Sequence, residues 1–135
     1  MNKLLIIIKP GFLKFAETVL EAFANIGFAY CDYKQTVLTQ EQCDIIWKDL
    51  KAQAERHPKK PQYAQYYADY CSYIMSGEVR CIIMESESDN YDRVLRTKLE
   101  LRHNNGFAKS FRDMLHTSDT NADALAEIDC IFNNN

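Results

Sequence analysis

Near its N-terminus the chain reads Leu4-Leu5-Ile6-Ile7-Ile8, an uninterrupted apolar run. Lys3 precedes this run, and the turn-forming sequence Lys9-Pro10-Gly11 ends it. An apolar run that stops at proline and glycine is typical of a strand buried on both faces of a sheet. We therefore predict a central strand at residues 4–8, with the neighbouring segments packed around it.

Helical and strand patterns alternate after this run. Apolar residues recur at helical spacing over residues 12–26, and residues 28–37 are rich in the aromatic and β-branched side chains of strands. A Thr-x-x-Gln capping box at the start of residues 39–50 indicates a second helix. Residues 51–62 are polar and basic, which favours a solvated connector over a ligand-binding lid.

The second half of the chain continues this alternation. Tyrosines recur at helical spacing over residues 63–74, a stripe typical of a core or an interface, although a tyrosine at its edge is also suited to stack on a base. The remaining predicted elements are, in order, a strand at 79–84, a helix at 91–101, a turn at 102–106, a strand from Phe107 or Phe111 to Leu115, and a helix that starts within 117–120.

This order of elements predicts the fold class. Strand, helix, strand, helices, strand, helix, strand, helix is the order of a ferredoxin-like split βαβ sandwich, an α/β (α+β) fold with a four-stranded antiparallel sheet and helices packed on it. Such a sheet can place Ile8-Lys9 beside Leu115-His116. The length of 135 residues suits a single domain over residues 1–135.

Composition excludes several classes of function. Apolar residues make up 47% of the chain and charged residues 26%, which is ordinary for a globular protein. The net charge of −3 argues against nucleic-acid binding through a broad basic surface. The five cysteines form no C-x-x-C pair, and the run at 4–8 is too short to span a membrane. We therefore expect a cytoplasmic protein with buried thiols, without nucleic-acid or membrane partners.

His116 is the first candidate for chemistry. It ends an apolar run and precedes small polar residues and a helix, so we expect its imidazole beside a helix N-terminus, a position that favours a bound phosphate. Glu127 follows eleven residues later on that helix. If the turn folds Glu127 back, its carboxylate would fix the imidazole tautomer and leave one ring nitrogen free to attack a phosphoryl group.

Cationic residues complete this hypothesis. Lys9 and three arginines, Arg93, Arg102 and Arg112, are candidates to stabilise the oxygens of a transferring phosphoryl group. Each residue also has a structural explanation when taken alone. A histidine at a strand end is more often structural than nucleophilic, and lysine and arginine are common surface residues.

Three motifs together resemble the nucleoside diphosphate kinase family. They are Ile7-Ile8-Lys9-Pro10, Tyr73-Ile74-Met75-Ser76-Gly77, and Arg112-x-x-x-His116-x-Ser118-Asp119 with Glu127 downstream. The resemblance implies a ping-pong reaction, in which a histidine takes the γ-phosphate of a nucleoside triphosphate and passes it to a nucleoside diphosphate. It also implies Mg²⁺ that enters with the nucleotide phosphates, and a homo-oligomer.

The resemblance assigns roles by position. His116 corresponds to the phosphorylated nucleophile, Glu127 to its orienting partner, and Lys9 to the lysine near the γ-phosphate and the ribose 3′-hydroxyl. No side chain is expected to bind Mg²⁺ directly, and Asp119 is a candidate ligand through water. The nucleotide-binding candidates are Lys9, Trp47 near the histidine, Tyr66 on the base, Arg93, Thr97 and Arg102 on the phosphates, Arg112, and Asp113 near the ribose.

The sequence also departs from the family pattern. Asp113 replaces an asparagine that contacts the ribose hydroxyl, and residues 51–62 resemble an insertion. The segment between Arg93 and Arg102 is shorter than usual. Our leading hypothesis is an active nucleoside diphosphate kinase. The alternative is a nucleotide-binding or interaction module of the same fold without turnover.

Overall fold

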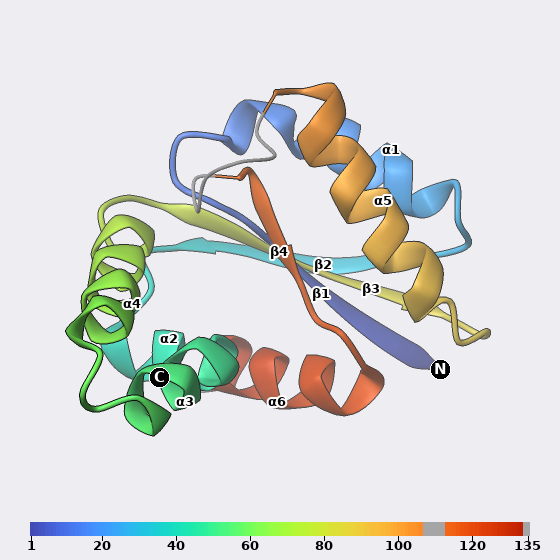
Figure 1. The fold of residues 1–135 in the computed structure, drawn as a ribbon. Helices are drawn as coiled ribbons and strands as arrows, with labels where there is room; N and C mark the ends of the chain where they lie inside the picture. The colour runs from blue at the N-terminus through green and yellow to red at the C-terminus, as the bar shows by residue number, and fades with distance from the viewer. Residues whose placement is uncertain (107–112, 134–135) are drawn as a thin grey trace.

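The computed structural model describes residues 1–106 and 113–133. In this part of the chain the strands are β1 (Asn2–Ile8), β2 (Ala29–Thr36), β3 (Val79–Ser86) and β4 (Leu115–Thr117). They form one four-stranded sheet in the order β2-β3-β1-β4, and every neighbouring pair is antiparallel (Figure 1). The predicted ferredoxin-like topology is therefore confirmed.

Strand β1 lies inside the sheet and is buried on both faces. Residues Leu4 to Ile8 have no exposed surface. Successive side chains of a strand point to opposite faces, so Leu5 and Ile7 enter one hydrophobic core, whereas their even-numbered neighbours enter the other. This double burial explains the uninterrupted apolar run. Four of the five cysteines are buried free thiols, and Cys31 is exposed.

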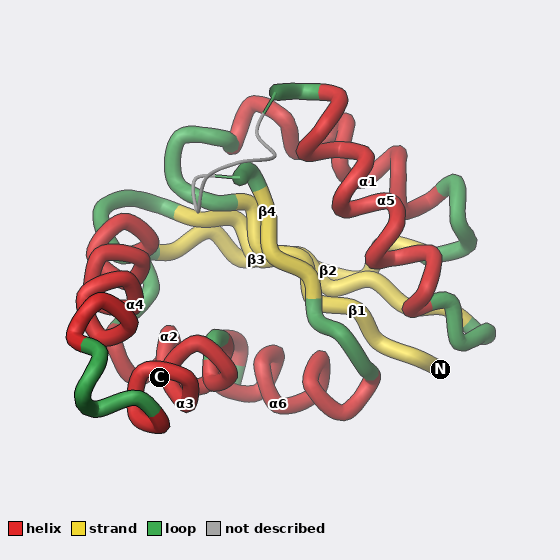
Figure 2. Tube along the Cα trace, in the orientation of Figure 1, coloured by secondary structure: helices red, strands yellow, loops and turns green. Residues whose placement is uncertain are grey.

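Helices cover both faces of the sheet (Figure 2). On one side lie a short 3-10 turn η1 (Leu13–Phe15), α1 (Ala16–Ala24) and α5 (Tyr91–Asn104); on the other side lie α2 (Gln40–Ile46), α3 (Lys48–Arg56), α4 (Pro61–Ile74) and α6 (Asn121–Phe132). None of these helices in the described part of the chain combines the length and apolarity needed to cross a membrane. The predicted order of elements is confirmed.

The segment between β2 and α4 differs from the prediction. The capping box is present, because the Thr39 hydroxyl accepts from the Gln42 backbone N–H and the Gln42 side chain accepts from the Thr39 backbone. The predicted single helix instead breaks at Trp47, where φ is −104° and ψ is 42°. The predicted connector at 51–62 is mostly helical, since α3 continues to Arg56 through good helix formers and α4 starts at Pro61. Only residues 57–60 connect the two helices.

Two predicted boundaries near the site also change. The turn predicted at 102–106 is wrong in part, because α5 continues to Asn104. Contacts that Arg102 makes outside its helix, described below, outweigh the local turn signal. The predicted strand start at Phe107 or Phe111 lies outside the described residues. Helix α6 begins at Asn121, with the Thr120 hydroxyl as its N-cap.

Candidate active site

His116 lies in the middle of β4, directly opposite Ile7 of β1. Its side chain therefore points to the face of the sheet that α6 covers. There the imidazole Nε2 lies 2.5 Å from Glu127 Oε1, and the Glu127 side chain is only 7% exposed. A carboxylate accepts hydrogen bonds, so this contact holds the proton on Nε2 and leaves Nδ1 with its lone pair.

The imidazole lies near two parts of the last helix. Glu127 lies in the middle of α6. In the first turn of α6, where we expected the imidazole, Thr120 is the N-cap and Asp123 forms an ion pair of 2.9 Å with Lys48. The hydrogen bond with Lys48 lowers the pKa of Asp123, and His116 contributes to this shift.

An aromatic series leads from solvent to the imidazole. The ring of Tyr66, which is 46% exposed, lies 6.5 Å from that of Tyr70. The buried Tyr70 meets Trp47 edge-on at 5.2 Å, and Trp47 meets His116 edge-on at 5.1 Å. The break at Trp47 between α2 and α3 thus coincides with a side chain that packs against the imidazole. Edge-to-face contacts of this kind restrict the orientation of the rings.

Lys9 follows β1 and is almost completely buried, at 1% exposure. Its Nζ donates to Asp113 Oδ1 at 2.5 Å and lies 4.9 Å from the centroid of the Tyr70 ring. Its backbone N–H donates to the Met114 carbonyl at 2.9 Å. Burial lowers the pKa of Lys9 to about 8, although the carboxylate of Asp113 acts in the opposite direction.

Arg102 connects α5 to the residues just before His116. Its Nε donates to the Asp113 carbonyl at 3.1 Å, and its Nη2 donates to the Leu115 carbonyl at 2.7 Å. The same Nη2 lies 3.3 Å from Asp113 Oδ2. Asp113 therefore bridges two cations, Lys9 through Oδ1 and Arg102 through Oδ2.

The backbone turns sharply between Asp113 and β4. Met114 has a φ of 82°, in the left-handed region that non-glycine residues rarely adopt. The Leu115 N–H donates to the Asp113 carbonyl at 3.1 Å, so residues 113–115 form a γ-turn of the strained, positive-φ kind. Lys9 and Arg102 both bind carbonyls of this turn, and their contacts hold a strained segment directly beside His116.

The remaining candidates for phosphate binding lie on different sides of helix α5. Arg93 is exposed and lies nine residues before Arg102, about two and a half turns away and so on the opposite side of the helix. Thr97 is half-buried and makes no hydrogen bond among the described residues. Lys98, which sequence reasoning did not single out, is half-buried one turn before Arg102 on the same face. Burial, and then the charge of Arg102, lower the pKa of Lys98.

The residues after β4 extend the strand pairing. Ser118 is buried, its N–H donates to the Leu5 carbonyl, and its hydroxyl accepts from the Leu5 N–H, each at 3.0 Å. Asp119 is exposed. Arg112 lies outside the described residues. Within residues 1–106 and 113–133, no group of three or more His, Cys, Asp or Glu side chains is arranged to hold a metal ion.

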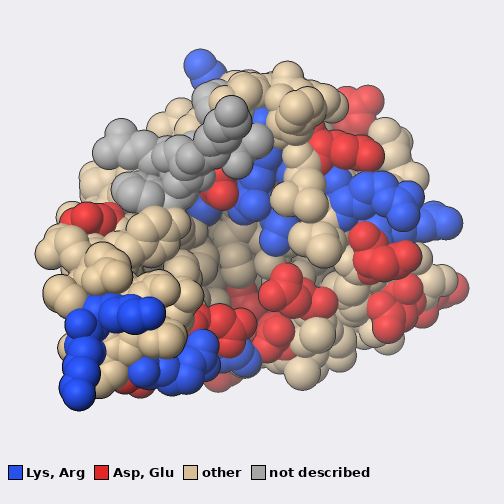
Figure 3. All heavy atoms as spheres, viewed as in Figure 1, with Lys and Arg blue, Asp and Glu red and all other residues tan. Residues whose placement is uncertain are grey.

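Charged side chains lie on both sides of the site around His116. In Figure 3 this face is hollowed at its centre, with Lys and Arg side chains beneath α5 on one side and Asp and Glu side chains beside α6 on the other. A cavity of about 310 Å³ lies next to the acidic side and is lined by Asp44, Ile45, Lys48, Asp123, Ala126 and Glu127. A larger one of about 510 Å³ lies between α3 and α4 against Tyr63 and Tyr66.

The arrangement has the parts that phosphoryl transfer requires. His116 offers an oriented nucleophilic nitrogen, and cations lie next to it. Of the sequence candidates, the structure brings Lys9, Trp47, Arg102, Asp113 and Glu127 together around His116, and Tyr66 joins them through Tyr70. It does not bring Arg93 to this group. Sequence reasoning missed Tyr70 and Lys98. For Lys98, the available signal was its spacing of four residues from Val94 and from Arg102.

The chain is similar to known proteins in both sequence and fold. A sequence model of the family described as nucleoside diphosphate kinase matches residues 2–135. By sequence, no curated protein matches the chain. Among solved structures, the chain is similar to an apo nucleoside diphosphate kinase from Encephalitozoon cuniculi, with 15% identity, a TM-score of 0.73, and coverage of 98% of this chain and 89% of that one.

Two further solved structures have the same fold. One is an NDP kinase from Pyrobaculum aerophilum, with 13% identity, a TM-score of 0.68, and coverage of 97% of this chain and 95% of that one. The other is the Aquifex aeolicus nucleoside diphosphate kinase, with 21% identity, a TM-score of 0.68, and coverage of 97% and 94%. At these identities the structural similarity establishes the shared architecture.

Proposed function

Because the chain belongs to the nucleoside diphosphate kinase family, we propose that His116 is the residue on which the phosphoryl group is carried between nucleotides. The enzyme is a phosphotransferase that moves the γ-phosphate of a nucleoside triphosphate to a nucleoside diphosphate. The observation that carries the assignment is the hydrogen bond of 2.5 Å between His116 Nε2 and the buried Glu127 carboxylate. It leaves Nδ1 as the attacking nitrogen.

In the first half-reaction the Nδ1 lone pair forms a bond to the γ-phosphorus. The bond from that phosphorus to the bridging oxygen breaks, and the nucleoside diphosphate leaves with the electron pair. The imidazole gains positive charge as the new bond forms, and the Glu127 carboxylate stabilises it through Nε2–H. Trp47 packs against the ring and limits its rotation, which keeps Nδ1 in place.

In the second half-reaction a terminal oxygen of an acceptor diphosphate attacks the same phosphorus. The Nδ1–phosphorus bond breaks and its electron pair returns to Nδ1, so the imidazole ends in its starting state. No proton is transferred at His116 in either step. This symmetry suits a fixed Nε2–H to Glu127 hydrogen bond that serves both directions of the reaction.

Lys9 and Arg102 are the proposed phosphate contacts nearest to His116. Both are held by Asp113, which keeps two cations side by side in a mostly buried position. A phosphate oxygen accepts charge-assisted hydrogen bonds from either group. The same Asp113 carboxylate is the proposed partner of a ribose hydroxyl. We leave Arg93 out of the proposed site because it lies on the exposed side of α5.

The proposed base contact is Tyr66, at the solvent end of the aromatic series. Its ring is 46% exposed, and Tyr70 lies behind it. Stacking on an aromatic face contributes about 1–3 kcal/mol per base and tolerates any base identity. Tyr66 therefore suits a kinase that accepts several nucleotides.

Mg²⁺ is proposed to enter with the nucleotide phosphates. This ion usually keeps several waters and binds phosphates together with one or two carboxylates. The donor set fits, because Asp119 is an exposed carboxylate three residues after His116. When bound, Mg²⁺ would neutralise part of the phosphate charge, with Asp119 as a ligand through water.

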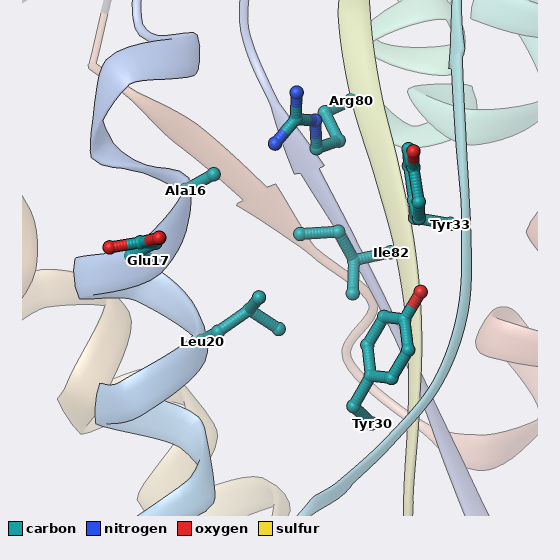
Figure 4. Close-up of a pocket in the computed structure, with 7 residues that line it drawn as sticks. All are labelled: Ala16, Glu17, Leu20, Tyr30, Tyr33, Arg80 and Ile82. Carbon is teal, nitrogen blue, oxygen red and sulfur yellow. The ribbon is translucent and has the colours of Figure 1, made fainter.

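We also propose self-association through β2. This strand is at the edge of the sheet, and edge strands present unpaired backbone groups to other chains. Tyr30 and Tyr33 on it are 52% and 53% exposed. They border a cavity of about 340 Å³, across which side chains of α1 face those of β2 and β3 (Figure 4).

The whole of residues 1–135 is proposed to act as one nucleoside diphosphate kinase domain in the cytoplasm. Five free cysteines, four of them buried, are compatible with a compartment that keeps thiols reduced.

A phosphate exchange assay tests the proposed function. Purified protein with Mg²⁺, GTP and ADP should form GDP and ATP, and His116→Ala should abolish this exchange. His103→Ala is the matched control, because His103 is an exposed histidine on α5 and should retain the wild-type rate. Nucleotide binding without exchange in the wild-type protein would contradict the proposed function.

A further inference from the structure

The cations next to His116 differ in the partners that they already bind within the protein. Lys9 donates to Asp113 at 2.5 Å, and Arg102 binds the same carboxylate at 3.3 Å as well as two backbone carbonyls. A nucleotide phosphate that approaches either group therefore competes with a carboxylate, and for Arg102 also with the backbone.

Lys98 is in a different situation. It lies on the same face of α5 as Arg102, one turn earlier, and is half-buried. Among the described residues it forms no ion pair and no hydrogen bond. The charges that act on it, in decreasing order, are those of Arg102, Asp119, Asp113 and Glu127.

Helical spacing places Lys98 beside the strand that carries His116. Arg102, one turn later on the same face of α5, binds the carbonyls of Asp113 and Leu115, which directly precede His116. The carboxylates of Asp119, Asp113 and Glu127 all act on the charge of Lys98, and among the described residues none of them forms an ion pair with it. Basic side chains in the hollow of Figure 3 lie along the same helix.

An unpaired, half-buried ammonium group is destabilised by the loss of water and by a like charge. Both effects act on Lys98, since burial and Arg102 lower its pKa. An anion bound in the hollow would reverse both effects. Lysine is a flexible point charge and is well suited to a phosphate oxygen.

We propose that Lys98 binds a phosphate oxygen of the nucleotide beside His116, on the face of α5 opposite to the one that carries Arg93. The inference rests on the proposed function of His116 and extends it by naming a substrate-binding residue. Donor triphosphate and acceptor diphosphate both carry phosphates, so Lys98 serves both half-reactions. Its loss weakens nucleotide binding more than it slows the bound complex.

The test compares three variants by the Kd for ADP, measured by calorimetry with Mg²⁺. Lys98→Met keeps the length of the side chain but removes the charge, and should raise the Kd about 10- to 100-fold, as expected for one hydrogen bond to a charged group. Lys98→Arg should stay close to the wild type. Arg96→Met removes a positive charge from an exposed position on α5 and is the matched control.

Each outcome decides one question. An ADP Kd in Lys98→Met equal to that in Arg96→Met would overturn the inference. Without nucleotide, Lys98→Met should be at least as stable to heat as Arg96→Met, because it removes a half-buried charge that burial and Arg102 destabilise; a large loss of stability only in Lys98→Met would indicate a structural role and would also overturn the inference. Lys98→Gln provides a second uncharged variant if Lys98→Met does not fold.

ADP binding does not require turnover, so the inference and the proposed function can fail separately. A wild-type protein that binds ADP through Lys98 but transfers no phosphate would contradict only the proposed function. A wild-type protein that exchanges phosphate, with no effect of Lys98→Met on the KM for ATP or on the Kd for ADP, would contradict only the inference. No binding of ADP at all would contradict both.

Discussion

The Asp113 Oδ1 atom lies 2.5 Å from Lys9 Nζ, and the other carboxylate oxygen lies 3.3 Å from Arg102 Nη2. One anion thus holds the two cations that we propose to bind nucleotide phosphates. Phosphate binding becomes a competition with a carboxylate that belongs to the protein. The position where the family has asparagine therefore affects both the stability of the empty site and its affinity for nucleotide.

Replacing Asp113 by asparagine should separate these two effects. At pH 6, where Lys9 is protonated, Asp113→Asn should lower the KM for ATP about 3- to 10-fold, because the phosphates no longer compete with a carboxylate. Without nucleotide, the free energy of unfolding should fall by about 1–3 kcal/mol, because two mostly buried cations lose their partner. Initial rates and thermal melts measure both, with the exposed Asp49→Asn as control. A raised KM would contradict this prediction, because it would show that the loss at the proposed ribose contact outweighs the relief of competition at the phosphates.

The pH dependence of kcat/KM should report Lys9. Burial lowers its pKa to about 8, Asp113 raises it, and Arg102 and Lys98 lower it. Lysine binds phosphate only when protonated, so kcat/KM should fall as the pH rises through about 8. Bound phosphates raise the pKa, so kcat should fall only at higher pH. Lys9→Arg should lose this decline, and Asp113→Asn should show it at a lower pH. A flat wild-type profile between pH 7 and 9 would contradict the assignment.

Glu127 should control the rate of phosphorylation. Glu127→Ala should lower kcat by roughly 10²- to 10⁴-fold, the range for loss of a residue that orients and stabilises a catalytic imidazole. Glu127→Gln should retain more activity, because its amide oxygen still accepts from Nε2–H. Asp129→Asn, an exposed change on the same helix, should change the rate by about twofold or less. Stopped-flow measurement of the first half-reaction tests this. Equal rates for Glu127→Ala and Asp129→Asn would show that the contact does not matter for the chemistry.

Trp47 is the single tryptophan of the chain, and its ring lies 5.1 Å from that of His116. A phosphate on the imidazole changes the charge beside the indole, so ATP should change the tryptophan fluorescence and ADP should reverse the change. The signal should disappear in His116→Ala and persist in His103→Ala. A fluorescence change of equal size in His116→Ala would show that binding, rather than phosphorylation, causes it.

The exposed edge at β2 predicts the oligomeric state. The wild-type protein should form at least dimers, and Tyr30→Glu should shift it toward monomers, because a buried carboxylate without a partner is unfavourable at an interface. Light scattering on a size-exclusion column measures this. Leu99→Glu is the control, since Leu99 on α5 is 51% exposed and lies away from β2. A monomeric wild-type protein, or equal masses for the two variants, would contradict association through β2.

Elements with strong local patterns could be predicted from the sequence. The run at residues 4–8 predicts β1 because burial on both faces requires every side chain to be apolar. The capping box predicts the start of α2 because its two hydrogen bonds are local. The position of the first strand beside the last follows from the topology of a split βαβ sheet, and the structure pairs Ile8 with Leu115.

Features that depend on long-range contacts could not be predicted. The Asn-Asn-Gly sequence after Arg102 indicates a turn, but α5 continues to Asn104. Arg102 binds carbonyls eleven and thirteen residues further along the chain. The sequence next to Trp47 contains no proline or glycine that would break a helix. The break there accompanies packing of the indole against Tyr70 and His116.

The candidate site shows the same division. The motif around His116 predicts both the histidine and its partner Glu127, because the two residues lie only eleven positions apart in one continuous segment. Lys98 was missed because the resemblance directs attention to Arg93, and only the extended α5 places Lys98 and Arg102 on one face. Helical spacing over residues 94–102 indicates that Lys98 and Arg102 share a face, but only if the helix continues as far as Arg102.

The most direct test is mass spectrometry of the protein after brief exposure to ATP and Mg²⁺. One added phosphate is expected, located on His116, labile in acid, and removed when ADP is added. His103→Ala should acquire the same phosphate, whereas His116→Ala should acquire none. No phosphate on the wild-type protein, or a phosphate that remains in His116→Ala, would contradict the assignment of His116 as the residue that carries the phosphoryl group.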